Sequence, residues 1–364
     1  MTNKKYRVGI VGLRGIGSKR PDEPPKPFKD IIGATPTISH AASLSRFSNI
    51  EVVGYCDLVS ELLEEFKESW KDQWPNAKGY TNYKEMLVKE QLDILAITTS
   101  DHRHTDIAVD AANAGVKGIF CEKPLATSVE DADRMINACE DKGVVLTVDH
   151  TRRFRPLLHK IRNTIRSGSI GPLSTIVVTH AGPRAMLFRN GTHIIDGICF
   201  FADSEPSQVF ARLEDGFEDW DHYKGDGGSL PENDPAASGF VLFRNGVRAF
   251  YCGSKKTAGG VTLQLLGQNG RIDFDYNGLT AELSAPGSAS VSSANDPGSV
   301  IKQTLVPDYY KVEGIEAGYR ELIDLIEKGG SSVSPAREAR KTVQIMLGFL
   351  KSQQAGSILV DVPE

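Results

Sequence analysis

The hydrophobic pattern of the first 150 residues alternates between the period of a strand and the period of a helix. Short apolar runs rich in β-branched residues are typical of buried strands, and they lie at residues 6–12, 51–56, 93–98, 118–121 and 144–148. Segments with apolar residues every three or four positions are typical of amphipathic helices, and they lie at residues 58–70, 83–89, 105–114 and 129–142. This alternation predicts a parallel sheet with helices on both faces. Such sheets bind ligands beyond the carboxyl ends of their strands.

The pattern changes after residue 150. One helical segment, residues 157–167, precedes strand-like runs that are separated by Asn-Gly pairs, at Asn245-Gly246, Asn269-Gly270 and Asn277-Gly278. Asn-Gly supplies the positive φ angles of a type I′ turn, so each pair predicts a β-hairpin. Two amphipathic helices and a short strand follow, at residues 315–328, 335–352 and 358–362.

These two patterns predict two domains of the α/β class. Residues 1–149 are expected to form a Rossmann domain with a doubly wound parallel sheet. Residues 150–364 are expected to form an α+β domain with a large, open, mostly antiparallel sheet. The length of 364 residues agrees with this division, because domains typically contain about 150 residues.

Composition and charge indicate a small-molecule partner. The chain has 42 Lys and Arg residues against 47 Asp and Glu residues, a net charge of −5, which favours neither nucleic acid nor an anionic membrane. No apolar run reaches the ~18 residues that span a bilayer, and the first residues lack the apolar region of a signal peptide. The five cysteines form no C-x-x-C pair, which fits reduced thiols. We therefore expect a cytoplasmic protein that binds neither nucleic acid nor membrane.

The first strand-like run ends in a glycine-rich turn, Gly12-Leu13-Arg14-Gly15-Ile16-Gly17. Its place after the first strand favours a dinucleotide-binding loop over a simple connector, although Arg14 stands where the G-x-G-x-x-G motif has its second glycine. Close approach of a pyrophosphate then requires that Gly15 takes over or that the Arg14 guanidinium itself binds phosphate. The cofactor-binding candidates in this turn are Gly12, Arg14, Gly15, Ile16 and Gly17.

An insertion is expected after this turn. Residues 18–37 contain four prolines, at positions 21, 24, 25 and 27, so a helix cannot continue directly from Gly17. The helix is expected to resume near residues 39–46, with its dipole pointing at the phosphates less directly than usual.

Asp57, at the end of the second strand-like run, fits the acid that accepts hydrogen bonds from the adenine ribose. Its carboxylate would repel a 2′-phosphate and Leu58 offers no compensating cation, so NAD is favoured over NADP. The insertion explains why Asp57 follows Gly17 by as many as 40 residues. An N-terminal helix cap is the alternative interpretation, and both roles are compatible.

A later strand-like run ends in Glu122-Lys123-Pro124, at the edge where ligands are expected. Oxidation of a secondary alcohol releases a hydride and a proton, and an amine with a pKa lowered toward neutrality accepts that proton. Burial and nearby cations lower the pKa of a lysine in this way. A surface lysine at a strand end fits this motif alone equally well. Pro124 also permits a cis peptide bond.

Together these motifs resemble the family of NAD(P)-dependent oxidoreductases that includes glucose-fructose oxidoreductase, inositol dehydrogenase and the rhizopine-catabolism proteins (Gfo/Idh/MocA). The resemblance spans the whole chain and rests on the order and spacing of its motifs. These are the glycine turn, Tyr55 to Asp57, Thr99 to His104, Cys121 to Ala126, Arg152 to Phe154, Gly168 to Gly171 and Gly191 to Asp196.

The resemblance implies roles for individual residues. Lys123 looks like the proton-relay lysine, and Glu122 and Lys123 are implied to lie near the nicotinamide ribose. Thr99 and His104 are implied to line the cofactor cleft. Arg152 or Arg153 is implied to contact cofactor or substrate.

A second group of residues, in the predicted second domain, is implied to face the substrate. His193 matches the histidine that shares or relays the proton in this family. Arg189 stands where many members carry an acid, four positions before that histidine. Asp196 either orients His193 or binds a sugar hydroxyl, with a capping or buried structural aspartate as the alternative. No metal site is expected, because His102 and His159 lack ligand-like spacing to other candidates.

The resemblance implies an NAD-dependent dehydrogenase that oxidises a secondary hydroxyl of a sugar, glycoside or cyclitol to a ketone, with C3 as the guessed position. The arginines Arg153, Arg184 and Arg189 would instead favour an acidic sugar. The alternatives are an NAD-dependent redox glycosidase of the same fold, a non-catalytic NAD-binding regulator, or the reverse reaction in the cell. The resemblance also implies a homo-oligomer, either a dimer or a tetramer, that assembles through the open sheet.

Overall fold

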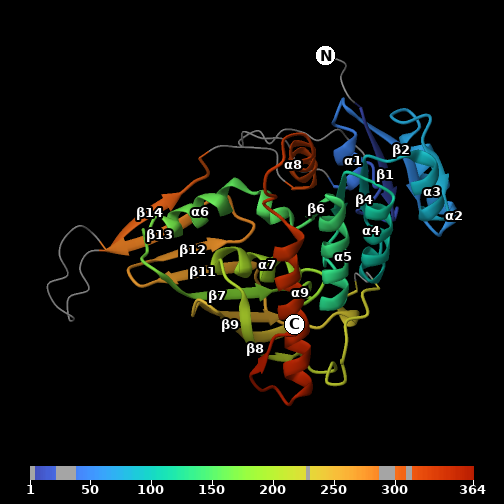
Figure 1. The fold of residues 1–364 in the computed structure, drawn as a ribbon. Coiled ribbons are helices and arrows are strands. Elements are labelled where there is room, and N and C mark those ends of the chain that lie inside the picture. Colours follow the sequence, from blue (N-terminus) through green and yellow to red (C-terminus); the bar gives the residue numbers. More distant parts are fainter. Residues whose placement is uncertain (1–4, 22–37, 227–229, 287–299, 309–313) are drawn as a thin grey trace, which may run out of the picture. The chain divides into compact units, whose positions relative to one another are not determined.

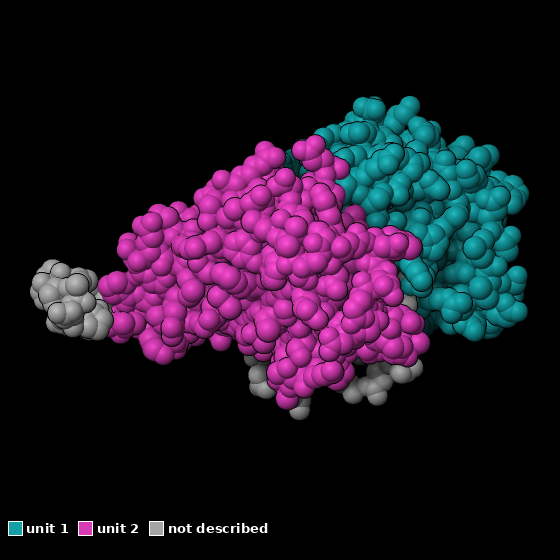
Figure 2. Space-filling view, turned by 90° about the horizontal axis from the view of Figure 1, so that it is seen from below, with its two compact units in different colours: residues 1–154, 224–227, 311–343 teal, residues 155–223, 228–310, 344–364 magenta. Residues whose placement is uncertain are grey.

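The protein folds around two sheets (Figure 1). The computed structural model describes residues 5–21, 38–226, 230–286, 300–308 and 314–364. Contacts divide the chain into two compact units, coloured separately in Figure 2. Unit 1 contains residues 1–154, 224–227 and 311–343, and unit 2 contains residues 155–223, 228–310 and 344–364.

The sheet of unit 1 is parallel and has the strand order β3-β2-β1-β4-β5-β6. Its strands are β1 (Tyr6–Val11), β2 (Ile50–Cys56), β3 (Lys78–Tyr80), β4 (Ile94–Ile97), β5 (Gly118–Cys121) and β6 (Val145–Val148). Every residue of β4 is fully buried, as expected of a central strand covered on both faces. The predicted doubly wound parallel sheet is confirmed.

Helices pack on both faces of this sheet. They are α1 (His40–Leu44), α2 (Ser60–Trp70), α3 (Tyr83–Glu90), α4 (His104–Asn113), α5 (Val129–Lys142) and α8 (Gly314–Lys328). Alternate residues of a strand face opposite sides. Val8 and Ile10 accordingly join the core that contains Tyr319 of α8, whereas the Cα of Gly9 faces Met86 of α3.

Helix α8 is remote in sequence from the sheet that it covers. Its apolar face, including Ile315, Tyr319 and Leu322, lies in the core of unit 1, and it approaches β5 so closely that a Cβ on Gly118 would lie 2.8 Å from Ile326. The compact units therefore differ from the predicted division into 1–149 and 150–364, which placed this helix in the second domain. An amphipathic pattern predicts that a helix covers a core but not which core.

The sheet of unit 2 has the strand order β14-β13-β12-β11-β7-β10-β9-β8-β15. Its strands are β7 (Leu173–Ala181), β8 (Pro206–Leu213), β9 (Ala237–Phe243), β10 (Arg248–Ser254), β11 (Val261–Gly267), β12 (Arg271–Asp275), β13 (Ala281–Pro286), β14 (Val300–Leu305) and β15 (Val360–Asp361). Among these strands β7 and β10 pair in parallel and the other neighbours are antiparallel. The predicted mostly antiparallel sheet is confirmed.

The three Asn-Gly pairs lie in hairpins, as predicted, but the predicted type I′ turns are wrong. That turn requires a positive φ at both central residues. Of these six residues only Gly246 has a positive φ, at +86°. The connections between β9 and β10, β11 and β12, and β12 and β13 are longer than the two residues of a type I′ hairpin, so the strands are joined by other loop geometries.

One face of this second sheet packs against helices. The helices are α6 (Pro156–Arg166), α7 (Gly191–Ala202) and the C-terminal part of α9 (Ala336–Gln354), and the core includes Ile195, Val241 and Phe349. The other face of β8 and β10 carries Phe210 and Phe250, which are 40% and 45% exposed. None of the described helices has the length and apolar composition needed to cross a bilayer.

Candidate active site

The carboxyl ends of the unit 1 strands bring most of the predicted cofactor-binding residues to one edge. The glycine turn follows β1, Asp57 follows β2, Thr99 follows β4, and Glu122 and Lys123 follow β5. Parallel neighbours end at the same edge, which is where dinucleotides bind in this architecture. A short 3-10 helix, η1 (Asp101–Arg103), continues from the β4 end into α4.

The glycine turn depends on close backbone contacts. Gly12 has a φ of +96°, and a Cβ there would lie 2.5 Å from the Thr98 carbonyl oxygen. A Cβ on Gly17 would lie 2.1 Å from the Gly12 carbonyl oxygen. By contrast, nothing lies within 4 Å of the Cβ position of Gly15, and Arg14 is exposed. The backbone at Gly15 is thus open to a ligand, which fits the idea that Gly15 takes over from the missing second glycine.

Helix α1 starts immediately after this turn in space. The N–H of His40 donates to the Ile16 carbonyl at 2.8 Å, and the N–H of Ala41 donates to the Gly17 carbonyl at 3.0 Å. Ser39 caps the helix, because its hydroxyl accepts from the Ala42 N–H at 3.0 Å. The helix therefore resumes after the predicted insertion, most of which lies outside the described residues.

Asp57 anchors the glycine turn. One carboxylate oxygen accepts the Leu13 N–H at 2.8 Å, and the other accepts the Val59 N–H at 3.0 Å, next to the start of α2. The side chain is half-buried, and each carboxylate oxygen has a further lone pair. The predicted helix cap is wrong, because the N-cap of α2 is Val59 and no side chain caps this helix. Acceptance of ribose hydroxyls by the half-buried carboxylate stays a prediction.

His104 connects two turns at the same edge. Its ring is fully buried, with Nδ1 3.0 Å from the Pro124 carbonyl oxygen and Nε2 3.2 Å from the Thr99 carbonyl oxygen. The Thr99 side chain is half-buried, and its hydroxyl donates to the Ser100 carbonyl at 3.2 Å. The place of Thr99 and His104 in the cofactor cleft stays a prediction. His104 would act there by fixing the backbone of Thr99 and Pro124.

The Glu122-Lys123 turn is buried, with exposed fractions of 6% and 9%. This burial removes the alternative of a surface lysine. The peptide bond between Lys123 and Pro124 is cis. The Lys123 N–H donates to a Glu122 carboxylate oxygen at 3.2 Å. Burial alone would raise the pKa of Glu122, but a hydrogen bond from His40 and the charge of Lys123 lower it to about 2.

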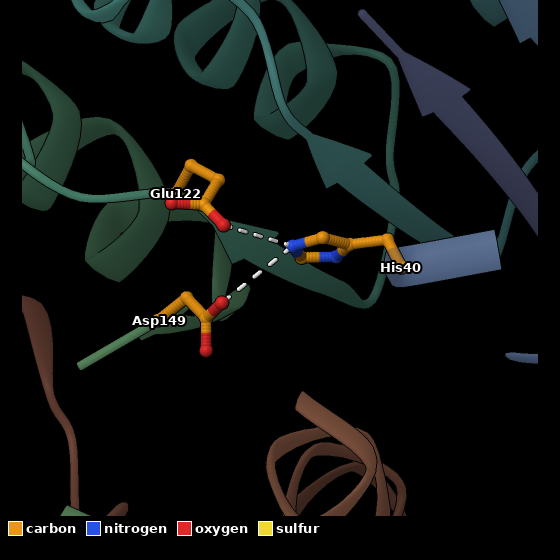
Figure 3. A group of neighbouring side chains, drawn as sticks. All are labelled: His40, Glu122 and Asp149. Carbon is orange, nitrogen blue, oxygen red and sulfur yellow. Dashed lines mark hydrogen bonds and ion pairs between the residues drawn. The ribbon is translucent and has the colours of Figure 1, made fainter. Parts of the chain in front are cut away.

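Two residues at this turn were missed by sequence reasoning. His40 and Asp149 lie beside Glu122 and are both buried, and together the three side chains form a group that has the donor atoms of a metal site (Figure 3). Their place could have been inferred in part, because Asp149 directly follows β6 and so lies at the same strand edge. The position of His40 could not be inferred from the sequence in this way, because it depends on where helix α1 begins after the insertion.

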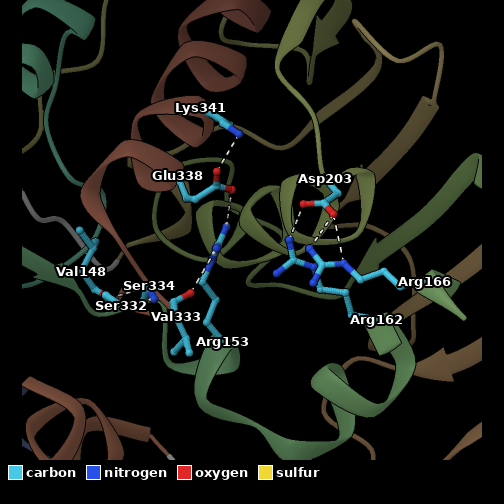
Figure 4. A network of polar contacts seen from close by, with 10 residues as sticks. All are labelled: Val148, Arg153, Arg162, Arg166, Asp203, Ser332, Val333, Ser334, Glu338 and Lys341. Atoms are coloured by element: carbon cyan, nitrogen blue, oxygen red, sulfur yellow. Dashed lines mark hydrogen bonds and ion pairs between the residues drawn. The ribbon is translucent and has the colours of Figure 1, made fainter. Parts of the chain in front are cut away.

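Arg153 is held within unit 1 by a polar network (Figure 4). Its guanidinium donates to the Val333 carbonyl and to Glu338, both at 3.3 Å, and Glu338 also pairs with Lys341 at 2.7 Å. Arg153 is only 3% exposed, whereas Arg152 is half-buried. Of the two arginines, Arg152 is therefore the better candidate for a ligand contact.

The remaining substrate candidates belong to unit 2 and lie on or before α7. His193 is half-buried, and its carbonyl oxygen accepts the Tyr276 hydroxyl at 2.9 Å. Asp196 is fully buried, which favours the structural alternative for this residue. Arg189 is half-buried and precedes the helix.

The turn before α7 has an anchor that the sequence did not reveal. The buried Asp234 accepts the Phe188 N–H at 3.1 Å and the Arg189 N–H at 2.7 Å. It comes from a loop about 45 residues away, so no local pattern links it to Arg189. Asp234 therefore fixes the backbone that carries Arg189 and leads into the helix of His193.

The parallel sheet of unit 1 and the residues at its carboxyl edge define a dinucleotide-binding protein. Comparison with known proteins shows which family it resembles. Residues 30–150 match the model of an oxidoreductase family with an NAD-binding Rossmann fold. This region of the chain is thus similar to the NAD-binding domain of the Gfo/Idh/MocA oxidoreductases. The resemblance inferred from the sequence is thereby confirmed, and so is NAD as the cofactor of the domain.

Similar proteins agree with this assignment. Inositol 2-dehydrogenase from Salmonella typhimurium is 34% identical over 167 residues, which are 45% of this chain and 43% of that protein. The chain thus spans about half, or less, of the length of the curated relatives it matches. Levoglucosan dehydrogenase in complex with NADH has a TM-score of 0.74 at 19% identity, over 99% of this chain and 100% of that one. The WlbA dehydrogenase of Bordetella pertussis, in complex with NADH and UDP-GlcNAcA, has a TM-score of 0.70 at 18% identity, with coverages of 99% and 100%. These structures support the fold along the whole chain.

Proposed function

We propose that the protein is an NAD-dependent dehydrogenase that oxidises a secondary hydroxyl of a sugar, glycoside or cyclitol to a ketone. The observation that carries this proposal is a buried lysine, Lys123, at the strand edge that also holds the glycine turn. A buried lysine loses part of its preference for the charged form, and this favours the neutral amine that accepts a proton.

The residues of unit 1 fit the coenzyme. The open backbone at Gly15 suits a pyrophosphate, and the half-buried Asp57 suits ribose hydroxyls. Helix α1 has five residues, so the turn's own N–H groups, rather than a long helix dipole, would hold the phosphates. When bound, the nicotinamide ring supplies the acceptor for the substrate's hydride.

The residues of the chain supply the proton chemistry. As the hydride leaves carbon, the Lys123 amine takes the hydroxyl proton, and the carbonyl bond of the ketone forms. Glu122 holds the Lys123 backbone through its carboxylate. His193 is proposed to relay the proton and to orient the hydroxyl, as the family resemblance implies.

The substrate class is proposed from the relatives. The names of the similar proteins refer to inositol and levoglucosan, a cyclitol and an anhydrosugar. Oxidation at C3 remains part of the proposal. An acidic sugar is less well supported, because Arg153 is already engaged with Glu338 and Arg184 is exposed with a contact to Asn190.

The test is a screen for NADH formation. The purified chain is incubated with NAD⁺ and with free sugars, inositols, sugar acids or aryl glycosides, and absorbance at the NADH band is followed. For an active substrate, Lys123→Ala is expected to lower turnover about 10²- to 10⁴-fold, because the proton acceptor is lost.

Lys117→Ala is the matched control for that variant. Lys117 precedes the same strand at its other end and pairs with Asp93, and nearly half of its side chain is exposed. Turnover should be unchanged in this control. Equal turnover in Lys123→Ala and the wild type would contradict the proposal, and glycoside cleavage without net NADH would indicate the redox glycosidase instead. Binding of NAD without turnover of any polyol would indicate a regulator.

A further inference from the structure

The hairpin turn after β12 reaches the helix that carries His193. Tyr276 directly follows β12, and its hydroxyl donates a hydrogen bond to the His193 carbonyl oxygen at 2.9 Å. Tyr276 is only 1% exposed. His193 lies in the first turn of α7, and both α7 and β12 belong to unit 2 (Figure 1). The reaction proposed above does not use Tyr276, although this residue contacts the backbone of one that the reaction does use.

The first turn of α7 lacks the usual local cap. Its N-cap residue is Asn190, whose side chain makes no capping hydrogen bond. Gly191 follows as the first helical residue, and glycine gives the backbone more freedom than any other residue. A side-chain cap would otherwise stabilise such a helix start. The position of His193 in this turn therefore depends on contacts with other parts of the chain.

Gly197 gives Tyr276 access to the His193 carbonyl. It lies one turn after His193 on α7, and a Cβ there would lie 2.3 Å from the Tyr276 hydroxyl oxygen and 2.8 Å from the ring carbon that carries it. Any larger residue at this position would therefore displace the hydroxyl. A carbonyl oxygen has two lone pairs, so that of His193 can accept the hydroxyl in addition to the helical N–H four residues on.

Arg155 holds the turn on which Tyr276 lies. Its guanidinium donates to the Tyr276 carbonyl at 2.6 Å and to the Gly278 carbonyl at 2.7 Å. The Tyr276 N–H donates to the Val261 carbonyl of β11 at 2.8 Å. The backbone of Tyr276 is thus fixed through its N–H and through its carbonyl, which gives the hydroxyl a defined position against α7.

We propose that Tyr276 is a positioning residue that fixes the backbone of His193 and thereby the direction of its imidazole. The carbonyl and the side chain of a residue start from the same Cα, so a change in the backbone of this turn also turns the side chain. Correct alignment of a group with the reacting atoms contributes directly to turnover. This inference rests on the proposed function, in which His193 relays the proton and orients the substrate hydroxyl.

Tyr276→Phe tests the inference, because it keeps the ring beside Gly197 and removes only the hydroxyl. The kcat for an oxidised polyol, measured from NADH formation, should fall about three- to tenfold, the range that corresponds to the loss of one hydrogen bond. The Kd for NAD should be unchanged, because the residues that fit the coenzyme belong to unit 1.

Tyr6→Phe is the matched control for that variant. Tyr6 is also buried, and its hydroxyl donates to Glu327 of α8 at 2.8 Å, so its partner is not a residue of α7. Both variants lose one hydroxyl hydrogen bond, and both should lower the free energy of unfolding to a similar extent. Only Tyr276→Phe should lower kcat. Equal falls of kcat in the two variants would indicate a general loss of stability and would overturn the inference.

A double-mutant cycle distinguishes positioning from a merely structural role. His193→Gln removes the group through which Tyr276 is proposed to act. In that background Tyr276→Phe should lower kcat less than about twofold, whereas a structural role would lower it as much as in the wild type. An equal effect in both backgrounds would overturn the inference.

The imidazole itself is followed by NMR of isotope-labelled histidine, with the His193 signal assigned by its absence in His193→Gln. Tyr276→Phe should shift or broaden this signal, and Tyr6→Phe should leave it unchanged. An unchanged signal in Tyr276→Phe overturns the inference and leaves the proposed function standing. If no polyol is oxidised, or if His193→Gln has the kcat of the wild type, the proposed role of His193 fails, and the NMR signal still decides whether Tyr276 positions it.

Arg155→Lys keeps the inference testable where Tyr276→Phe does not fold. Lysine retains the charge, but its ammonium group cannot reproduce the guanidinium fork that bridges the Tyr276 and Gly278 carbonyls. The kcat should fall about two- to fivefold, and this fall should disappear in the His193→Gln background. A fall that persists in that background would overturn the inference.

Discussion

Asp57 in unit 1 and Asp234 in unit 2 have the same structural role but differ in their exposure to solvent. Each carboxylate accepts two backbone N–H groups and thereby fixes a turn that carries candidate site residues. Asp57 is half-buried, whereas Asp234 is only 6% exposed. The first therefore retains lone pairs that a ligand can reach, and the second is confined to its structural role. Exposure therefore decides whether a ligand could reach an anchoring carboxylate.

The largest effect is expected at the buried anchor. Asp234→Ala leaves two N–H groups, of Phe188 and Arg189, without their acceptor inside the protein. The free energy of unfolding should fall by about 3 kcal/mol, because each unsatisfied buried group costs about 1–3 kcal/mol. Chemical denaturation measures this change. Glu232→Ala, at a neighbouring exposed position, should change it little, and equal losses in the two variants would show that Asp234 is no anchor.

Glu122 is a third carboxylate to compare, because it is buried and is balanced by the positive charge of His40. The contribution of His40 to the free energy of unfolding depends on pH. The pKa of His40 is raised to about 9, so its stabilising contribution is complete below its ordinary value of about 6.5 and is lost as the pH rises to about 9. The difference in unfolding free energy between wild type and His40→Gln should therefore shrink by about 3 kcal/mol between pH 6 and 10. Denaturation across this range tests it, and a difference that is constant with pH would contradict a raised pKa.

The smallest effect is expected at the half-buried anchor, and it should appear in binding. Asp57→Asn keeps the shape of the side chain and removes its charge, so the Kd for NAD should rise about tenfold, which is about 1.4 kcal/mol. The preference for NAD over NADP should fall at the same time. Calorimetric titration with both dinucleotides measures this. Asp72→Asn, which changes an exposed acid paired with Arg20, is the control. Unchanged discrimination in Asp57→Asn would show that this carboxylate does not face the ribose.

The sequence predicts the parts of the fold that depend on local period. Apolar runs predicted the parallel strands of unit 1, and Asn-Gly pairs predicted the hairpins of unit 2, because both signals are contained in a few adjacent residues. The turn type was wrong because it depends on where the flanking strands end. The location of α8 was missed because an apolar helix face does not specify which sheet it covers.

The residues of the candidate site also divide into those that the local sequence predicts and those that only the fold identifies. Gly12 and Lys123 could be predicted because each lies within two residues of the end of a strand, and parallel strands bring such residues to one edge. His40, Asp149 and Asp234 could not be assigned a role, since each acts through partners that are far apart in sequence. Only the fold brings His40 to Glu122 and Asp234 to Arg189.

The start of α1 also bears on how this region of the chain could be redesigned. The bonds from Ile16 to His40 and from Gly17 to Ala41 each join residues 24 apart, where an uninterrupted helix joins residues four apart. Both bonds thus share one offset, so α1 continues the helical phase that begins at Ile16 and Gly17. A shortened protein that lacks 20 residues of this stretch, and so keeps two residues between Gly17 and His40, would give both bonds the four-residue offset of an uninterrupted helix.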